Sequence, residues 1–415
     1  MDVVPNEARR YLRAGEFWAD YGDLDISNVD PSLLVIPALG TVLPVAYALG
    51  VPVRVPLVEA NFAAAATELA PIWCDVYSSF SRDGFELIGE RVTAAAESAQ
   101  GSLLLYSGGL DSVASLLANE ENVETLLSVW GADVALDDDG LWSNLQSTID
   151  KCTLTSGLRR IVVRSNLREL LDQPRLIHDF LGGPPNDWWG GVQHGMGLLS
   201  LAAPVTGTIG LDTVLLAGSH SVDFHVPWGS SPRTDNVVRW GDTRVVHDSF
   251  ELTRQGKIDK LIAPRVREGG EMLLAVCYQP GRGAEAINCG TCEKCLRTAS
   301  GLLAAGIDPR SLGLATGVSD LHAWQSRLSA GQRSLDGNEV FMWQDVQRSV
   351  DPSAPTLPDV GPYLAWLARF DFTGLSRRPI TRRGKLKSEA KYRTKQIARG
   401  LPVGIQGRLR RLKRR

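Results

Sequence analysis

The sequence predicts an α/β protein with a doubly wound parallel sheet, a small N-terminal α/β domain and a four-cysteine metal-bound segment. Three observations support this prediction. From residue 102 onward, short apolar runs alternate with helical segments, which is typical of a parallel sheet covered by helices on both faces. The length of 415 residues exceeds what one hydrophobic core usually supports. Six cysteines in a chain that shows no signal-peptide pattern suggest metal binding or chemistry instead of disulfides.

The chain divides into four parts. Residues 1–98 are expected to form an accessory α/β domain, 99–310 the main sheet with the cysteines, 311–375 a helical extension, and 376–415 a disordered basic tail. The uncharged stretch 32–53 approaches the roughly 20-residue length of a membrane span. Its prolines and glycines favour buried helix-and-turn structure in a soluble domain, so no transmembrane segment is expected.

The main sheet is expected to begin with a strand at Leu103–Tyr106, followed by a glycine turn and a helix at Val113–Ala118. Further strands are predicted at Thr125–Val129, Ile161–Val163, Thr213–Ala217 and Met272–Cys277, and further helices at Ser143–Thr155, Val192–Ala203 and Leu296–Ala305. Ligands of such sheets bind beyond the carboxyl ends of the strands. The loops that follow the strands therefore hold the candidate site residues.

The turn after the first strand has the sequence Ser107-Gly108-Gly109-Leu110-Asp111-Ser112. Its glycines let the backbone approach a ligand closely, and the helix start presents unpaired N–H groups that suit phosphate oxygens. Ser107 and Ser112 add hydroxyl donors, while Asp111 is either a helix cap or a partner of Mg²⁺. A lysine-containing Walker A ending is absent from the sequence. The plainer interpretation is a well-capped turn without a ligand.

This motif resembles the signature of the N-type ATP pyrophosphatases, the PP-loop superfamily, whose sheet is Rossmann-like and of the HUP type. The resemblance implies that Ser107–Ser112 binds the pyrophosphate part of ATP with Mg²⁺, and that Asp111 and Ser112 serve catalysis. It further implies attack of a substrate oxygen on the α-phosphate to give an adenylate, from which a nucleophile displaces AMP. It also places the end of the second strand near the adenine, where Trp130 either contacts the base or packs in the core.

Four cysteines form a metal-ligand pattern. Cys289, Cys292 and Cys295 are spaced as Cys-x₂-Cys-x₂-Cys, and Cys277 lies 12 positions upstream. Four thiolates can surround Zn²⁺ at about 2.3 Å, and a complete ligand set implies a structural site. An iron–sulfur cluster or unliganded buried thiols are the alternatives. The arrangement is similar to that of the 7-cyano-7-deazaguanine synthases, in which the matching cysteines bind zinc, and this resemblance favours zinc.

Three later segments complete the predicted site. The loop Gly218-Ser219-His220 follows a strand and is expected to contact substrate, with His220 as a general base or a hydrogen-bonding group. The turn-rich segment 227–235 is either a lid over the substrate or an ordinary surface loop. Arg254 and Lys257 lie three apart on one helical face, so both can reach one anion, in a segment that looks like one facing ATP phosphates in the deazaguanine branch. A solvated basic face is the alternative.

The charge is unevenly distributed. Residues 376–415 hold 16 of the 44 Lys and Arg but only one of the 47 Asp and Glu. Clustered basic residues suit an anionic membrane surface or nucleic acid, although Tyr392 alone offers base stacking. A solvated tail without a partner is the third option. We expect a cytoplasmic protein, with peripheral membrane attachment through this tail.

These patterns predict an ATP-dependent ligase that forms AMP and pyrophosphate and makes a C–N bond at a carboxylate or carbonyl-type oxygen of a small molecule. The likeness to the nitrile synthases covers about residues 102–305 and leaves the acceptor open, so the chain looks more like a relative of those enzymes than a member. The alternatives are an RNA-modifying enzyme, for example a thiolation enzyme, and a protein that senses ATP without turnover.

Overall fold

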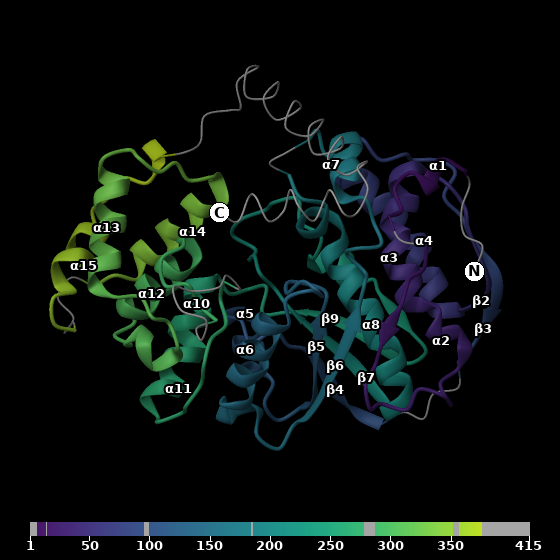
Figure 1. Ribbon diagram of the computed structural model, residues 1–415, viewed down its shortest axis with the longest axis horizontal. Coiled ribbons are helices and arrows are strands. Elements are labelled where there is room, and N and C mark those ends of the chain that lie inside the picture. Colours follow the sequence, from purple (N-terminus) through teal and green to yellow (C-terminus); the bar gives the residue numbers. More distant parts are fainter. Residues whose placement is uncertain are drawn as a thin grey trace.

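The computed structural model describes residues 6–13, 15–94, 99–183, 186–277, 287–351 and 357–375. A seven-stranded sheet with the order β1-β6-β5-β4-β7-β9-β8 lies at its centre (Figure 1). The strands are β1 (Ala19–Asp20), β4 (Ala99–Leu105), β5 (Val123–Trp130), β6 (Arg159–Ser165), β7 (Leu211–Ala217), β8 (Arg239–Trp240) and β9 (Thr243–Asp248). The five inner strands are parallel, and the two edge strands are antiparallel to their neighbours. The predicted α/β class is confirmed, and the mostly parallel sheet is compatible with a Rossmann-like fold.

Both faces of the sheet are covered, which explains why its central strands are apolar on both sides. Side chains alternate along a strand, so Leu103 and Leu105 of β4 enter one core while Leu104 enters another. The first face is covered by α3 (Ile36–Leu49), α4 (Ala60–Val76) and α8 (His194–Ile209), and the second by α5 (Leu110–Ala118) and α6 (Asp139–Asp150). The second face also receives the cysteine segment.

The N-terminal segment shares its core with the main sheet. Helix α3 packs against α8, and the Tyr21 hydroxyl donates to the Leu201 carbonyl at 3.2 Å. A separate two-stranded parallel sheet, β2 (Val53–Glu59) and β3 (Leu87–Val92), lies beyond these helices. The uncharged stretch 32–53 forms mainly the buried helix α3. In the described part of the chain, no helix has both the length and the apolar composition needed to cross a bilayer.

Four of the five expected strands of the main sheet are confirmed as β4, β5, β6 and β7. The strand expected at Met272–Cys277 is wrong, because this segment is irregular and pairs with no strand. Its Ala275 N–H donates instead to the Gly108 carbonyl at 2.7 Å. The place beside β7 is taken by β9, whose hydrogen bonds satisfy that side of the sheet.

The C-terminal helices form a third core at the opposite end of the molecule from α1–α4 (Figure 1). They are α12 (Glu293–Ala304), α13 (Val318–Ser329), α14 (Gly337–Arg348) and α15 (Gly361–Leu367). Trp324 and Trp343 are buried and stack at 5.8 Å between ring centroids, and Trp366 packs at the edge, as expected of packing residues. The basic tail lies outside the described residues. The remaining helices are α1 (Asn6–Arg9), α2 (Pro31–Leu34), α7 (Gln173–Phe180), α9 (Pro232–Asp235), α10 (Arg254–Lys257) and α11 (Ala263–Arg267).

Candidate active site

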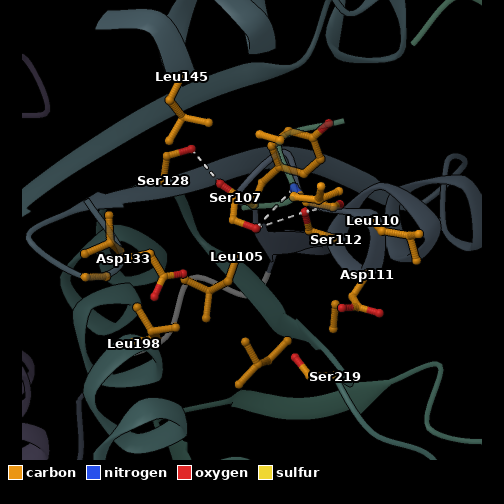
Figure 2. Close-up of a pocket in the computed structure, with 18 of the residues that line it drawn as sticks. Leu105, Ser107, Leu110, Asp111, Ser112, Ser128, Asp133, Leu145, Leu198 and Ser219 are labelled. Carbon is orange, nitrogen blue, oxygen red and sulfur yellow. Dashed lines mark hydrogen bonds between the residues drawn. The ribbon is translucent and has the colours of Figure 1, made fainter. Parts of the chain in front are cut away.

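The turn between β4 and α5 joins a buried strand to the start of a helix, as predicted. Gly108 adopts a φ of +69°, a conformation that favours glycine. Gly109 is the N-cap and supplies no side chain to the first free N–H groups of α5. The Ser112 hydroxyl donates to the Gly109 carbonyl at 3.1 Å and lies 3.3 Å from the Ser107 hydroxyl (Figure 2). The turn therefore presents two hydroxyl groups beside an uncapped helix start.

Asp111 lies in the first turn of α5, where it is buried and paired with two cations. Its carboxylate oxygens lie 2.5 Å from an Arg254 guanidinium nitrogen and 3.3 Å from Lys257 Nζ. Burial by itself would raise the pKa of Asp111, but the charges of Arg254 and Lys257 outweigh it and hold this pKa well below its ordinary value. Arg254 and Lys257 do reach one anion, as their spacing predicts, and that anion is Asp111. Asp111 is thus an ion-pair partner and not the N-cap.

Helix α10 carries both cations on one face. The Thr253 hydroxyl caps it by accepting from the Gly256 N–H at 3.0 Å. Gln255 is buried, and its backbone N–H donates to Asp345 of α14 at 3.2 Å. Lys257 is 1% exposed and also donates to the Gly218 carbonyl. The C-terminal helices therefore fix the position of α10, and α10 fixes the two cations.

A pocket opens beside the turn, at the carboxyl ends of β4, β5 and β7. Its polar lining includes Ser107, Asp111, Ser112, Ser128, Asp133, His194, Ser219, Arg254 and Lys294. In Figure 2, Asp111 and Asp133 lie on opposite sides of this pocket, with Ser107 and Ser112 between them. The position agrees with the rule that open parallel sheets bind ligands at this edge.

Three polar residues of the lining were missed by sequence reasoning. Asp133 follows β5 by three residues, and its place in the loop after a strand could have identified it. Lys294 lies between two predicted metal ligands, which could also have identified it. His194 begins α8 and carries no sequence signal. Burial lowers the pKa of His194 and of Lys294, and no hydrogen-bond partner for His194 Nδ1 occurs among the described residues.

The loop after β7 contributes both to the pocket and to its support. Ser219 lines the pocket, whereas His220 is not part of that lining. The His220 ring packs edge-on against Trp228 at 5.1 Å. Burial lowers the pKa of His220 to about 4, so its imidazole is neutral at pH 7. Gly218 is required by close packing, because a Cβ there would lie 2.8 Å from His247 Nε2.

Trp130 lies outside the pocket lining, although it follows the predicted strand. It stacks on Trp142 at 5.2 Å with an interplanar angle of 4°, and Arg164 lies 4.7 Å above its ring. Trp142 lines the pocket in its place. The aromatic side chain that lines the pocket is therefore Trp142 of α6 and not Trp130.

The segment 227–235 is tied by backbone hydrogen bonds to α8 and to the π-helical turn Trp189–Gln193 that precedes it. The Gly229 N–H donates to the Gly190 carbonyl, and the Gly195 N–H donates to the Gly229 carbonyl, both at 2.7 Å. Asp235 is buried and lies 2.8 Å from His247 Nδ1. No residue of this segment lines the pocket, and a swinging movement of the segment would break several hydrogen bonds.

The four predicted cysteines come together. The sulfurs of Cys277, Cys289, Cys292 and Cys295 all lie within 4.8 Å of one another. Tetrahedral zinc with bonds of about 2.3 Å requires roughly 3.8 Å between sulfurs, and Cys289 and Cys295 are 3.9 Å apart. Hydrogen bonding to Cys277 and crowding by the other thiols raise the pKa of Cys292 and Cys295. Four thiolates therefore need a compensating cation, and the cluster suits a metal such as zinc.

The cysteine cluster adjoins the turn Ser107–Ser112. Asn288 is buried; its Oδ1 accepts from the Val276 N–H at 2.8 Å, and its Nδ2 donates to the Leu274 carbonyl at 2.6 Å. Between them, Ala275 bonds to Gly108 of the turn. The segment leading to Cys277 is thus held by the cluster on one side and by the turn on the other.

Comparisons with protein-family models, with curated proteins and with solved structures find no match for this chain. The chemical capacity of the site consequently follows from its own residues. Uncapped backbone N–H groups, hydroxyls and cations are groups that bind oxyanions, and clustered thiols bind soft metals.

Proposed function

We propose that this protein is a PP-loop type enzyme that converts ATP to AMP and pyrophosphate while activating a small-molecule oxygen as an adenylate. One observation carries the proposal. The turn Ser107–Ser112 and three cations, Arg254, Lys257 and Lys294, converge at the carboxyl edge of the parallel sheet. An edge rich in donors and positive charge is suited to a triphosphate.

Each group of the turn has a role in this proposal. The free N–H groups of α5 and the hydroxyls of Ser107 and Ser112 would bind the β- and γ-phosphate oxygens. Asp111 is the residue that would hold Mg²⁺, because a carboxylate has lone pairs beyond those used by its two cations. Bound Mg²⁺ would neutralise phosphate charge. Arg254 and Lys257 would add positive charge where the leaving pyrophosphate develops its negative charge.

The proposed reaction has two steps. A carboxylate or carbonyl-type oxygen of the substrate forms a bond to the α-phosphorus while the bond to the bridging oxygen breaks, and pyrophosphate leaves. A nucleophile such as ammonia then attacks the activated carbon, loses a proton and displaces AMP. His194 and Asp133 line the pocket and would hydrogen-bond the acceptor, whereas the neutral His220 lies outside the lining and would support the wall through Trp228.

We further propose that Cys277, Cys289, Cys292 and Cys295 hold a structural zinc ion. Their sulfurs approach one another as a single tetrahedral ion requires. An iron–sulfur cluster would hold its thiolates farther apart because several iron atoms lie between them. All four positions are cysteines, which leaves no open coordination site, and a closed site is structural.

The test is to incubate the purified protein with ATP, Mg²⁺ and pools of small carboxylic acids with ammonium, and to detect AMP, pyrophosphate and adduct by mass spectrometry. We expect AMP and pyrophosphate in equal amounts, dependent on one acid, and lost in Ser112→Ala. Formation of ADP, or no binding of ATP by calorimetry, would contradict the proposal. Pyrophosphate release that depends on tRNA would favour an RNA-modifying enzyme.

A further inference from the structure

We infer that Lys294 binds the phosphates of the nucleotide and that the cysteine-bound metal determines its position. The inference rests on the proposed function, which it extends by a residue outside the Ser107–Ser112 turn. Lys294 lies in the first turn of α12, two residues after the N-cap Cys292 and directly before Cys295. Its side chain lines the same pocket as Asp111 and Arg254.

The first argument is the state of the pocket's cations. Arg254 and Lys257 are already paired with Asp111, and Lys257 also bonds to Gly218. Within the described part of the chain, the Lys294 ammonium group has no ion pair and no hydrogen bond. A partly buried ammonium without a partner is unfavourable. An anionic ligand in the pocket would supply the negative charge that Lys294 lacks.

Neighbouring acidic side chains do not neutralise the charge of Lys294. Asp133 lines the pocket and Glu293 precedes Lys294, but neither lies within ion-pair distance of it. Glu293 is instead paired with Arg297 at 2.7 Å. The positive charge of Arg254 acts on the same space, so two cations attract the ligand together. The charge balance therefore selects a ligand with several negative charges over a monoanion.

The second argument is the position of Lys294 between two metal ligands. The first turn of α12 is held at Cys292 and Cys295, whose sulfurs a metal would fix in space. The Cys292 sulfur also caps α12, because it accepts from the Cys295 N–H at 3.5 Å. Metal binding would therefore stabilise the backbone that carries Lys294 and so orient its side chain toward the turn. Lys294 is in this sense the link between metal and nucleotide.

The experiment measures ATP and AMP affinity by calorimetry on metal-loaded protein, with zinc content determined for every sample. Lys294→Met is expected to weaken ATP binding at least about tenfold, equivalent to roughly 1.4 kcal/mol. AMP binding should change less than about twofold, since the lost contacts are with the outer phosphates, and zinc content should be unchanged. Lys294→Arg should retain ATP binding, as should Lys260→Met, which removes an exposed lysine.

The second arm removes the metal with a chelator and follows the fold by circular dichroism. ATP affinity of the unsubstituted protein should fall toward that of Lys294→Met, and the variant should lose little more, because one contact is lost by either route. Normal ATP affinity in zinc-loaded Lys294→Met would overturn the inference, whether or not the stripped protein folds. Absence of ATP binding in the unsubstituted protein would instead remove the proposed function, and this inference with it.

Discussion

The turn Ser107–Ser112 and the cysteine cluster lie side by side, yet they are organised in different ways. The turn is held by the protein's own interactions: Gly108 bonds to Ala275, and Asp111 is paired with two cations. The cluster brings four thiols within 4.8 Å of one another, and the backbone N–H groups of Cys289, Cys292 and Cys295 donate to sulfurs of the cluster. We therefore expect the turn to keep its conformation without a ligand, and the cluster, which crowds four thiols, to depend on a metal ion for its stability.

Substitutions in the two regions should therefore have different effects. Substitution in the cluster should affect the stability of the fold first, because α12 and the segment before Cys277 meet there. Substitution in the turn should affect ligand binding and turnover first. Ala275 and Lys294 connect the two regions, so a substitution in one region should also have a smaller effect on the other. The following predictions test it, from the largest expected effect to the smallest.

The largest effect is expected for Cys292→Ser. Structural zinc contributes up to about 10–16 kcal/mol of apparent binding free energy in zinc-finger peptides, so loss of even a part of this should lower the unfolding temperature by about 10 °C. Zinc per chain should fall from one toward zero, measured by elemental analysis beside a calorimetric melt. Cys152→Ser is the control, because Cys152 is a buried thiol outside the cluster. Unchanged stability of Cys292→Ser without bound metal would show that the cluster does not depend on a metal ion. Iron with acid-labile sulfide in the unsubstituted protein would replace zinc by an iron–sulfur cluster.

A smaller effect is expected for Asp111→Asn. We expect AMP formation to fall by at least about tenfold, or roughly 1.4 kcal/mol of transition-state stabilisation, since the neutral amide can neither hold Mg²⁺ nor balance Arg254 and Lys257. The variant should stay folded in a thermal melt and keep its zinc. Asp308→Asn serves as control, because Asp308 pairs with Arg310 on the surface. Unchanged turnover would exclude Asp111 from the mechanism.

The pH dependence of stability tests whether Arg254 and Lys257 stabilise the Asp111 carboxylate. The folded pKa of Asp111 is lowered by its cations relative to the unfolded chain, where Asp titrates near about 3.9. Its contribution is therefore fully present above the unfolded pKa and is lost as pH falls through the folded pKa. Urea unfolding between pH 5 and pH 2.5 (about the range that brackets this loss) should show a steeper fall for the unsubstituted protein than for Asp111→Asn. Parallel curves would show that Asp111 is not stabilised by its cations; acid loss of the metal affects both proteins alike.

Much of the fold was predictable because apolar runs of strand length are visible in the sequence. β4, β5, β6 and β7 were found in this way. The segment Met272–Cys277 has the same composition, but its apolar side chains are buried against α5 and α12 outside any sheet. Burial alone therefore does not distinguish a strand from a packed irregular segment. β9 was missed because its alternation of apolar and polar residues is short and lies among polar turns.

For the site, local motifs were sufficient and distant partners were not. The turn and the cysteines are contiguous patterns with fixed spacing, and the structure brings both together as expected. The pairing of Asp111 with Arg254 joins positions 143 residues apart, which spacing on one helix cannot show. His194 and Trp142 line the pocket because of helix packing, and their residue types are ordinary in helices. Tertiary contacts of this kind have no sequence signature.

The smallest effect on the two regions is expected from removal of residues 376–415. This tail carries 16 basic residues against one acid and lies outside the described residues. We expect a chain ending at Leu375 to keep its zinc and to bind ATP within about twofold of the full chain, because charges are screened over roughly 8 Å at physiological salt.

The same truncation should abolish binding to anionic vesicles. Basic residues near anionic headgroups contribute about 1 kcal/mol each, and the apolar residues within 401–412 suit a headgroup region better than RNA phosphates. Sedimentation with phosphatidylserine vesicles, repeated at rising salt, measures the effect, since electrostatic binding weakens steeply with salt. Absence of vesicle binding by the full chain at low salt would exclude the lipid partner and leave nucleic acid to be tested. Loss of small-molecule turnover in the folded truncation would show that the tail belongs to the active site. Residues 1–375 would then not be sufficient for the proposed reaction.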